Sequence, residues 1–353
     1  MKIAQVAPLH ESVPPKLYGG TERIVAFLCD ALVDLGHEVT LFACGDARTK
    51  AALVATRERA LRLDPGPVHW ELPAHVLQLA EVQRRADEFD LIHFHTDPIY
   101  FPVFAERARR TITTLHGRQD FTDLQLLYQH WPNFPLVCIS RSQSSPISFV
   151  PDLSIVHHGL PLDLYHPPAE PRRDYLAFVG RMSPEKRPDR AIEIAERAGM
   201  ALHMAAKIDP TEEVYFRREV QPLLQAAHVN YVGEIGEAQK SAFLGHAHAL
   251  LFPIDWPEPF GLAMVEAMAC GTPVIAWNCG SVPEIIDHGE TGFIVASIEE
   301  AVEAVQRIGE LDRARVRRRF EERFSAKTMA RNYVALYERL LAGAARPSVA
   351  AAR

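Results

Sequence analysis

The stretch Glu258-Pro-Phe-Gly-Leu-Ala-Met-Val-Glu266 is the part of this chain that most clearly indicates its fold. An apolar run, residues 249–253, precedes it, and the small residues 267–271 follow it. This order predicts a strand, a loop that carries Glu258, and a helix that begins near Gly261 and carries Glu266. The first turn of a helix has free N–H groups that favour anions, and both carboxylates would flank the bound group. A diphosphate with a hydroxyl-rich group at each end suits such a site, so the stretch predicts a nucleotide-sugar pocket.

The composition is typical of a globular protein with two ordinary domains: 353 residues, of which 48% are hydrophobic and 24% charged. The formal net charge of -7 argues against nucleic acid as a partner, because nucleic-acid-binding domains usually carry a basic face. No apolar run approaches the roughly 18 residues that span a bilayer. Residues 1–8 lack the pattern of a secretion signal, and the five cysteines are scattered. We therefore expect a cytoplasmic protein.

Both halves of the chain alternate β-branched runs with amphipathic helices, which is typical of parallel α/β sheets. In the first half the predicted strands are 2–7, 38–43, 90–95, 111–115, 136–140 and 154–157, and the clearest helices are 21–35 and 74–89. In the second half the predicted strands are 175–179, 201–205, 229–232, 249–252, 273–276 and 292–295, and the helices include 188–198, 211–227, 237–247 and 262–269. The fold class is therefore predicted to be α/β, with two doubly wound, Rossmann-like domains.

The boundary between the halves is predicted in residues 161–173, which are rich in proline and charge and show no apolar periodicity. We expect a first domain at 1–165 and a second at 174–325. A helix at 326–342 has no strand after it, and we expect it to pack back across the domain boundary. Ligands of open α/β sheets bind beyond the carboxyl ends of the strands, so a cleft between the domains is the expected site.

Six segments occur in the order and in the strand–loop–helix contexts of one enzyme family, and together they cover essentially the whole chain. They are Tyr18-Gly-Gly-Thr-Glu-Arg23, Leu35-Gly-His-Glu-Val39, Thr114-Leu-His-Gly117, Val179-Gly-Arg-Met-Ser-Pro-Glu-Lys186, Glu258 to Glu266, and Gly271-Thr-Pro-Val274. On these residues the chain resembles the retaining, nucleotide-sugar-dependent enzymes of glycosyltransferase family 4. The resemblance implies the two-domain GT-B fold, with the acceptor on the first domain and the donor on the second.

Two cations follow the first predicted strand of the second half. Arg181 and Lys186 bracket a loop that contains a proline, and together they would neutralise a diphosphate and stabilise the leaving group. Gly19 and Gly20 precede a predicted helix of the first half, where bare backbone lets a phosphate approach. The plainer interpretations are a solvated basic loop and an ordinary glycine turn.

The resemblance assigns further donor contacts to the second domain. Glu266 resembles the glutamate that binds the ribose hydroxyls, and Glu258 resembles the one that contacts the donor sugar. Ile235, in the loop after a predicted strand, would lie against the base. The backbone N–H groups that complete the sugar contact would be those of Phe260, Gly261 and Leu262. The alternative is that both glutamates are solvated, which the apolar neighbours of Glu266 disfavour because a buried carboxylate needs a partner.

His116 ends a predicted strand and resembles the active-site histidine that reaches toward the donor sugar. An isolated histidine at a strand end is more often a structural hydrogen-bonding group. Three further residues of the first half follow strand ends and are candidates for the acceptor side, with capping or salt-bridge roles as the alternatives: Asp97, Arg118 and Arg141. His93 and His95 share a strand face but have no metal-ligand spacing, so no metal and no cofactor are expected.

Two basic segments have no assigned role. Residues 48–63 interleave arginines with apolar residues, and residues 313–319 are dominated by arginine. Solvated surface helices are the favoured interpretation of both segments, with contact between the first and an anionic membrane surface as the alternative.

The sequence therefore predicts a metal-independent, retaining glycosyltransferase that acts on a UDP- or GDP-sugar. Its acceptor would be a saccharide, a lipid-linked group or a small molecule. The alternatives are a nucleotide-sugar epimerase on the same fold and a non-catalytic subunit that binds a sugar nucleotide.

Overall fold

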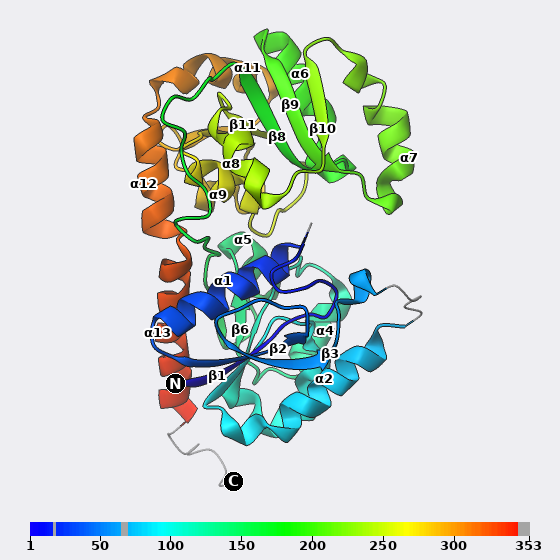
Figure 1. Ribbon diagram of the computed structural model, residues 1–353, viewed down its shortest axis with the longest axis vertical. Helices are drawn as coiled ribbons and strands as arrows, with labels where there is room; N and C mark the ends of the chain where they lie inside the picture. Colours follow the sequence, from blue (N-terminus) through cyan, green and yellow to red (C-terminus); the bar gives the residue numbers. More distant parts are fainter. Residues whose placement is uncertain (17–18, 65–69, 345–353) are drawn as a thin grey trace. The chain divides into compact units, whose positions relative to one another are not determined.

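The computed structural model describes residues 1–16, 19–64 and 70–344, and it divides into two compact units (Figure 1). Unit 1 combines residues 1–159 with the C-terminal stretch that begins at Ala326, and unit 2 holds residues 160–325. Residues 160–165, which the sequence placed in the first domain, belong to unit 2. There Tyr165 is fully buried and its hydroxyl donates a hydrogen bond to Glu237 at 2.7 Å.

Unit 1 is built on a seven-stranded parallel sheet with the order β3-β2-β1-β4-β5-β6-β7. The strand order reverses between β1 and β4, where Ile3 of β1 pairs with Leu91 of β4 on one side and with Val39 of β2 on the other. The strands are β1 (Lys2–Val6), β2 (Glu38–Cys44), β3 (Ala52–Arg57), β4 (Leu91–Phe94), β5 (Thr111–Thr114), β6 (Leu136–Cys138) and β7 (Leu153–Ile155). The α-helices are α1 (Gly20–Asp34), α2 (Leu72–Arg84), α3 (Phe101–Phe104), α4 (Thr122–His130), α5 (Arg141–Ser144) and α13 (Ala326–Ala344).

Unit 2 is built on a six-stranded parallel sheet with the order β10-β9-β8-β11-β12-β13, which reverses between β8 and β11. The strands are β8 (Tyr175–Arg181), β9 (Ala201–Lys207), β10 (Val229–Gly233), β11 (Leu250–Phe252), β12 (Val274–Trp277) and β13 (Gly292–Val295). The α-helices are α6 (Pro188–Ala198), α7 (Glu213–Tyr215), α8 (Glu237–Gly245), α9 (Leu262–Ala269), α10 (Val282–Ile285), α11 (Ile298–Arg307) and α12 (Arg313–Arg323). In a doubly wound sheet the point of reversal opens a crevice at the carboxyl ends of the two strands, so each unit has one such position.

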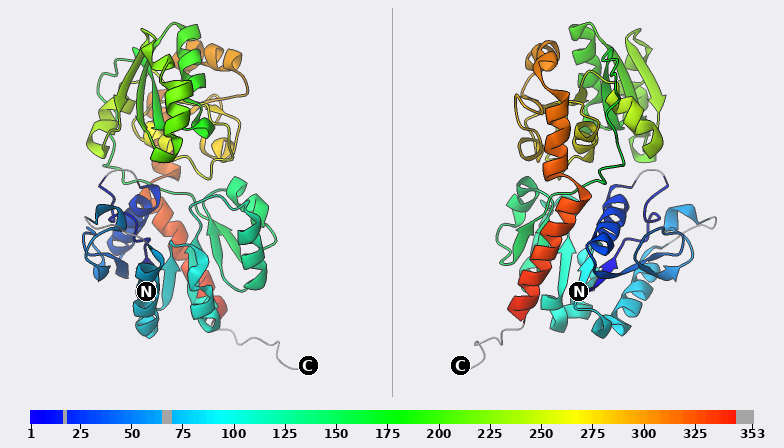
Figure 2. Two further views of the ribbon diagram at one scale, coloured as in Figure 1. Left: turned by 90° about the vertical axis from the view of Figure 1, so that its right-hand side faces the viewer. Right: turned by 60° about the vertical axis from the view of Figure 1, so that its left-hand side comes forward.

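The C-terminal helix α13 belongs to unit 1, where it packs against α1 (Figure 2). Its apolar and aromatic side chains recur at helical spacing, and Met329, Tyr333 and Tyr337 are buried. The tyrosine hydroxyls reach polar groups on the unit 1 sheet. A helix from the far end of the sequence therefore contributes to the core of unit 1.

The prediction of a surface helix at residues 48–63 is wrong. Residues 52–57 form the edge strand β3, and Leu53 pairs with Leu41 of β2. Two of the basic side chains outside the strand are held by acids: Lys50 lies 2.7 Å from Asp34, and Arg62 lies 2.9 Å from Glu11. Pairing with β2 outweighs the local amphipathic pattern, because strand formation depends on the neighbouring strand more than on intrinsic propensity.

Two other helix predictions need correction. The single helix expected at 211–227 is replaced by short turns and a π-helical segment at Phe216–Val220, and Pro222, which lacks an N–H, prevents a continuous helix. The basic run 313–319 is helical, but it is not simply solvated. Arg313 donates to the carbonyl oxygens of Gly245 and Ala247 at 2.8 Å, and Arg317 donates to that of Tyr165 at 2.7 Å. Within the described residues, none of the helices is both long and apolar enough to cross a membrane.

Candidate active site

The point of reversal in unit 2 brings together the segments that follow β8 and β11. Arg181 ends β8, and the loop after β11 carries Glu258. The two segments are joined by a backbone hydrogen bond of 2.9 Å from Asp255 to the carbonyl oxygen of Glu185. Arg181 and Glu258, which are far apart in the sequence, therefore lie beside the same crevice.

The two cations after β8 occupy different surroundings. Arg181 donates from Nη2 to Glu185 at 2.7 Å, whereas its Nε is buried. Neither this Nε nor the buried hydroxyl of Ser183 has a hydrogen-bond partner among the described residues. The side chain of Lys186 is 14% exposed, and its ammonium lies 4.7 Å from the ring centroid of Trp256. Buried donors without partners next to a positive charge are suited to an anion.

Glu258 is held on three sides. Its carboxylate pairs with the ammonium of Lys186 and accepts a hydrogen bond of 2.9 Å from the indole of Trp256. Its backbone carbonyl accepts a hydrogen bond of 3.0 Å from the N–H of Ser281. Gly280 passes so close that a Cβ built on it would lie 2.3 Å from the nitrogen of Glu258. The position of this carboxylate is therefore fixed by both side-chain contacts and backbone packing.

Helix α9 carries the second glutamate. Gly261 precedes the helix with φ of 82°, a left-handed conformation that suits glycine, and Phe260 is buried while Leu262 begins the helix. Glu266 is only 2% exposed, and its carboxylate lies 3.0 Å from the ammonium of Lys240 on α8. Because a buried carboxylate needs a partner, the contact with Lys240 holds Glu266 in place.

The remaining donor candidates lie on other segments of the chain. Ile235 is in the loop between β10 and α8 and is partly buried. Gly19 and Gly20 begin α1 in unit 1. A Cβ built on Gly19 would lie 2.9 Å from the side chain of Pro15, so this position requires a small residue because of close packing.

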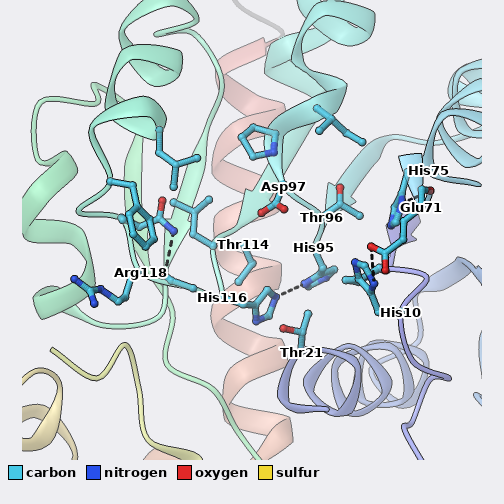
Figure 3. Close-up of a pocket in the computed structure, with 18 of the residues that line it drawn as sticks. His10, Thr21, Glu71, His75, His95, Thr96, Asp97, Thr114, His116 and Arg118 are labelled. Atoms are coloured by element: carbon cyan, nitrogen blue, oxygen red, sulfur yellow. Dashed lines mark hydrogen bonds and ion pairs between the residues drawn. The ribbon is translucent and has the colours of Figure 1, made fainter. Parts of the chain in front are cut away.

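Unit 1 contains a pocket of about 530 Å³ at its own point of strand reversal (Figure 3). Residues that follow β1, β4 and β5 line it together with residues of α1 and α2. Figure 3 shows the imidazoles of His95 and His116 directed toward one another across a hydrogen bond of 3.0 Å. The lining includes His10, Thr21, Glu71, His95, Asp97 and His116.

The three acceptor-side candidates fall in different places. Asp97 and Arg118 line the pocket with His116, as the sequence predicted of residues after neighbouring strands. The guanidinium of Arg118 is held by the carboxylate of Asp120, with one hydrogen bond of 2.9 Å. Arg141 begins α5, is exposed and lies outside the described lining of the pocket. No three His, Cys, Asp or Glu side chains of the described residues form a group that could hold a metal ion.

A network of buried polar side chains lies behind His116. His95 contacts Gln5 at 2.8 Å, and Gln5 donates to the hydroxyl of Tyr337 at 3.2 Å. His93 contacts that hydroxyl and Thr114, each at 2.7 Å. The sequence pattern pointed to His93 and His95 only as possible metal ligands and gave no role to Gln5 or Tyr337. The alternation of His93 and His95 along one strand indicated that their side chains share a face of the sheet. Nothing in the sequence indicated that Tyr337 on α13 packs against that face.

Burial controls the protonation of these histidines. It lowers the pKa of His116 to about 3. The pKa values of His93, His95 and His158 lie well below their ordinary range, again chiefly because burial disfavours the charged imidazolium. At neutral pH all four are uncharged, so His116 can offer a lone pair or an N–H but not a positive charge.

Unit 1 is therefore expected to lose stability in mild acid. The unfolded chain protonates its histidines below about pH 6.5, while His93, His95, His116 and His158 stay neutral in the folded unit. The unfolded state then binds more protons, so stability falls as pH falls. Four extra protons correspond to about 5 kcal/mol per pH unit once the unfolded chain is fully protonated. Denaturant unfolding between pH 7.5 and 5 measures this slope.

Replacing one of these histidines gives the control. His158→Phe removes one of the four titrating groups, so the slope of stability against pH should fall by about a quarter, whatever the absolute stability of the variant. A wild-type free energy of unfolding that stays constant from pH 7 to pH 5 would contradict the assignment of buried neutral histidines.

Comparison with known proteins identifies the family. Residues 167–325 match the model described as glycosyl transferases group 1, and residues 18–139 match the model described as Glycosyltransferase Family 4. Spore coat protein SA of Bacillus subtilis (strain 168) is 24% identical over 388 residues, which cover 96% of this chain and 100% of that protein. A D-inositol 3-phosphate glycosyltransferase of Mycobacterium sp. (strain KMS) is 32% identical over 167 residues, which cover 40% of this chain and only 36% of that enzyme.

Solved structures resemble the chain over nearly its whole length. AviGT4, a glycosyltransferase involved in avilamycin A biosynthesis, is 26% identical with a TM-score of 0.73, and the match covers 97% of this chain and 98% of that one. Anabaena Alr3699/HepE, solved in complex with UDP and glucose, shares the fold with a TM-score of 0.74 at 18% identity, over 96% of this chain and 100% of that one. The chain therefore belongs to the family 4-like glycosyltransferases with the GT-B fold.

Proposed function

We propose that the enzyme transfers a sugar from a nucleoside diphosphate sugar to an acceptor hydroxyl with retention of anomeric configuration. The observation that carries this proposal is the group around the β8–β11 crevice of unit 2. There Lys186 pairs with Glu258, Arg181 ends β8, and the buried Glu266 lies on the helix that follows Glu258 in the chain. This combination suits a ligand that joins a diphosphate to hydroxyl-rich groups at both ends.

Each residue then has a definite task. Arg181 and Lys186 neutralise the diphosphate and stabilise it as it departs. Glu266, held by Lys240, accepts hydrogen bonds from the ribose, and Glu258 accepts them from the donor sugar. The backbone around α9 and the loop at Ile235 complete the donor site. The backbone N–H groups of Phe260, Gly261 and Leu262 contact the sugar. Ile235 lies against the base. Gly19 and Gly20 offer backbone N–H groups to a phosphate.

Retention and independence of metal follow from the same proposal. The two cations supply the positive charge that a divalent ion provides in other transferases. The departing phosphate oxygen accepts the proton of the acceptor hydroxyl, and the new bond forms on the face from which the phosphate leaves. No general base is then needed, and His116 positions a hydroxyl rather than carrying charge.

The pocket of unit 1 favours an uncharged, hydroxyl-rich acceptor. Asp97 is exposed on its lining, and Glu71 lies 3.3 Å from His10. Burial lowers the pKa of His10 despite this carboxylate, so at neutral pH His10 does not offset its charge. The one arginine of the lining, Arg118, is already held by Asp120. An anionic acceptor would therefore meet net negative charge, whereas a neutral saccharide would find hydrogen-bonding groups.

Donor binding is the first test. We expect calorimetry to detect one sugar nucleotide from a panel of UDP-, GDP-, ADP- and dTDP-sugars, with UDP- and GDP-sugars tried first. Glu266→Gln should weaken its affinity at least about tenfold, because the neutral amide loses the charge-assisted hydrogen bonds to the ribose. Glu193→Gln is the matched control, because Glu193 lies on the solvent side of α6 and its loss should leave affinity unchanged.

The bound donor then permits a test of the reaction. Neutral and phosphorylated saccharides are offered as acceptors in the presence of EDTA, and the anomeric configuration of the product is read by NMR. Transfer to a neutral acceptor with retention supports the proposal. Conversion of the donor to an isomer without any acceptor would show an epimerase. Tight donor binding without turnover on any acceptor would favour a binding subunit.

A further inference from the structure

The polar network of unit 1 has a direction that determines which nitrogen of His116 carries a proton. It runs from Tyr337 on α13 through Gln5 and His95 to His116, with contacts of 3.2, 2.8 and 3.0 Å. Gln5 and Tyr337 are fully buried and His95 is 4% exposed. Buried groups of this kind must satisfy one another, because water does not reach them.

The direction follows from the Gln5 amide. Its NH₂ group donates to the hydroxyl of Tyr337, so its carbonyl oxygen faces Nε2 of His95. A carbonyl oxygen has no proton to give, hence Nε2 of His95 is the donor. His95 is neutral, so its other nitrogen, Nδ1, has a lone pair.

The lone pair on Nδ1 of His95 determines which nitrogen of His116 is protonated. Nδ1 of His95 faces Nε2 of His116, so the proton between them belongs to His116. His116 is also neutral, which leaves its own Nδ1 as an acceptor. Within the described residues no hydrogen bond to this Nδ1 is made, and His116 lines the pocket (Figure 3).

We propose that Tyr337, Gln5 and His95 are positioning residues that hold His116 as the Nε2–H tautomer, so that Nδ1 accepts a hydrogen bond from a substrate hydroxyl in the pocket. The role of His116 in the reaction rests on the proposed function, whereas the tautomer does not. The opposite tautomer would present an N–H to the pocket and would no longer accept from a hydroxyl.

Two tyrosines of α13 provide a matched pair of variants. Tyr337→Phe removes the hydroxyl that orients the Gln5 amide, so the amide can reverse and donate to His95. Tyr333→Phe removes a hydroxyl of the same kind that contacts Thr114 at 2.7 Å and lies outside the path from Gln5 to His116, being joined to Tyr337 only through Thr114 and His93. Both changes keep the aromatic ring and its packing.

The decisive measurement is the ¹⁵N spectrum of histidine-labelled protein. We expect wild-type His116 and the Tyr333→Phe variant to show a protonated Nε2 and an unprotonated Nδ1, with a mixture or reversal in Tyr337→Phe. A protonated Nδ1 in the wild type, or identical spectra in all three proteins, would overturn the proposal. The spectrum can be recorded without any turnover. A failure of the proposed function is therefore distinguishable from a failure of the tautomer proposal.

Kinetics supply the second readout. In Tyr337→Phe the kcat for transfer should fall about tenfold or more while the KM for the donor stays within twofold, and Tyr333→Phe should match the wild type. Equal losses in both variants would show that the network only supports the fold. His95→Phe breaks the path directly and should lower kcat at least as far as Tyr337→Phe.

Discussion

Lys186→Met is expected to lower kcat/KM for sugar transfer at least about 100-fold, the scale on which single charge-stabilising donors act in enzyme sites. Methionine keeps the length and apolar stem of lysine, so the packing of the stem should largely survive, whereas the cation–π contacts of the ammonium with the rings of Trp256 and Phe252 are lost. What disappears is the ammonium group beside Glu258. In the proposed mechanism the departing diphosphate would then lose one of its two positive partners. Steady-state kinetics with the identified donor measure the effect.

The accompanying stability loss should be moderate, because the largely buried carboxylate of Glu258 loses its ionic partner. The carboxylate of Glu258 keeps its hydrogen bond from the indole of Trp256, and its backbone carbonyl keeps that from Ser281. Lys186→Arg should recover only part of the activity, since the planar guanidinium does not fit a site shaped for an ammonium. Arg218→Ala removes an exposed cation paired with Glu219 and controls for net charge. Activity of Lys186→Met within twofold of the wild type would remove Lys186 from the donor site.

Gly280→Ala is expected to disable the donor site by a steric route. The new Cβ would lie 2.3 Å from the nitrogen and 2.6 Å from the oxygen of Glu258, so the backbone of that loop must move. Gly280 also has φ of 59°, which disfavours alanine. Overpacking and backbone strain together should lower the free energy of unfolding of unit 2 by about 2–4 kcal/mol. Transfer should fall with it, because Glu258 is displaced from Lys186.

Gly289→Ala separates these two causes. Gly289 has φ of 78°, and a Cβ there meets no described atom within 4 Å. It should cost only the backbone strain, about 1–2 kcal/mol, and leave transfer intact. Denaturant unfolding and donor calorimetry on both variants give the comparison. If the free energy of unfolding falls equally in both variants and both bind the donor normally, the close packing of Gly280 on Glu258 does not contribute to donor binding.

The sequence predicted most of the fold because parallel α/β proteins repeat a local pattern. Strands such as β1, β2 and β13 are buried apolar runs, and α6 and α9 have clear start and stop signals, including Pro188 and the glycines that follow or precede them. These signals act within a few residues and survive in any tertiary context. The edge strand β3 was missed because its pattern resembles an amphipathic helix and only its neighbour β2 makes it a strand.

The candidate site was predictable where a motif carried the chemistry. Arg181, Lys186 and Glu258 follow strand ends, and parallel strands bring such positions to one edge of a sheet. The partners of these residues were not predictable. Lys240 reaches Glu266 from another helix, and Trp256 reaches Glu258 from within a loop whose path is set by Gly280.

By itself, then, the sequence determined that this protein has two doubly wound domains and carries the charged and glycine-rich segments of a family 4-like glycosyltransferase. Only the tertiary structure decided which side chains hold those groups in place. It placed Tyr337, more than 200 residues from the strand that carries His93, behind the pocket of His116. The physical reason is that local patterns specify helices and strands, whereas the state of a buried imidazole depends on whichever distant group packs against it.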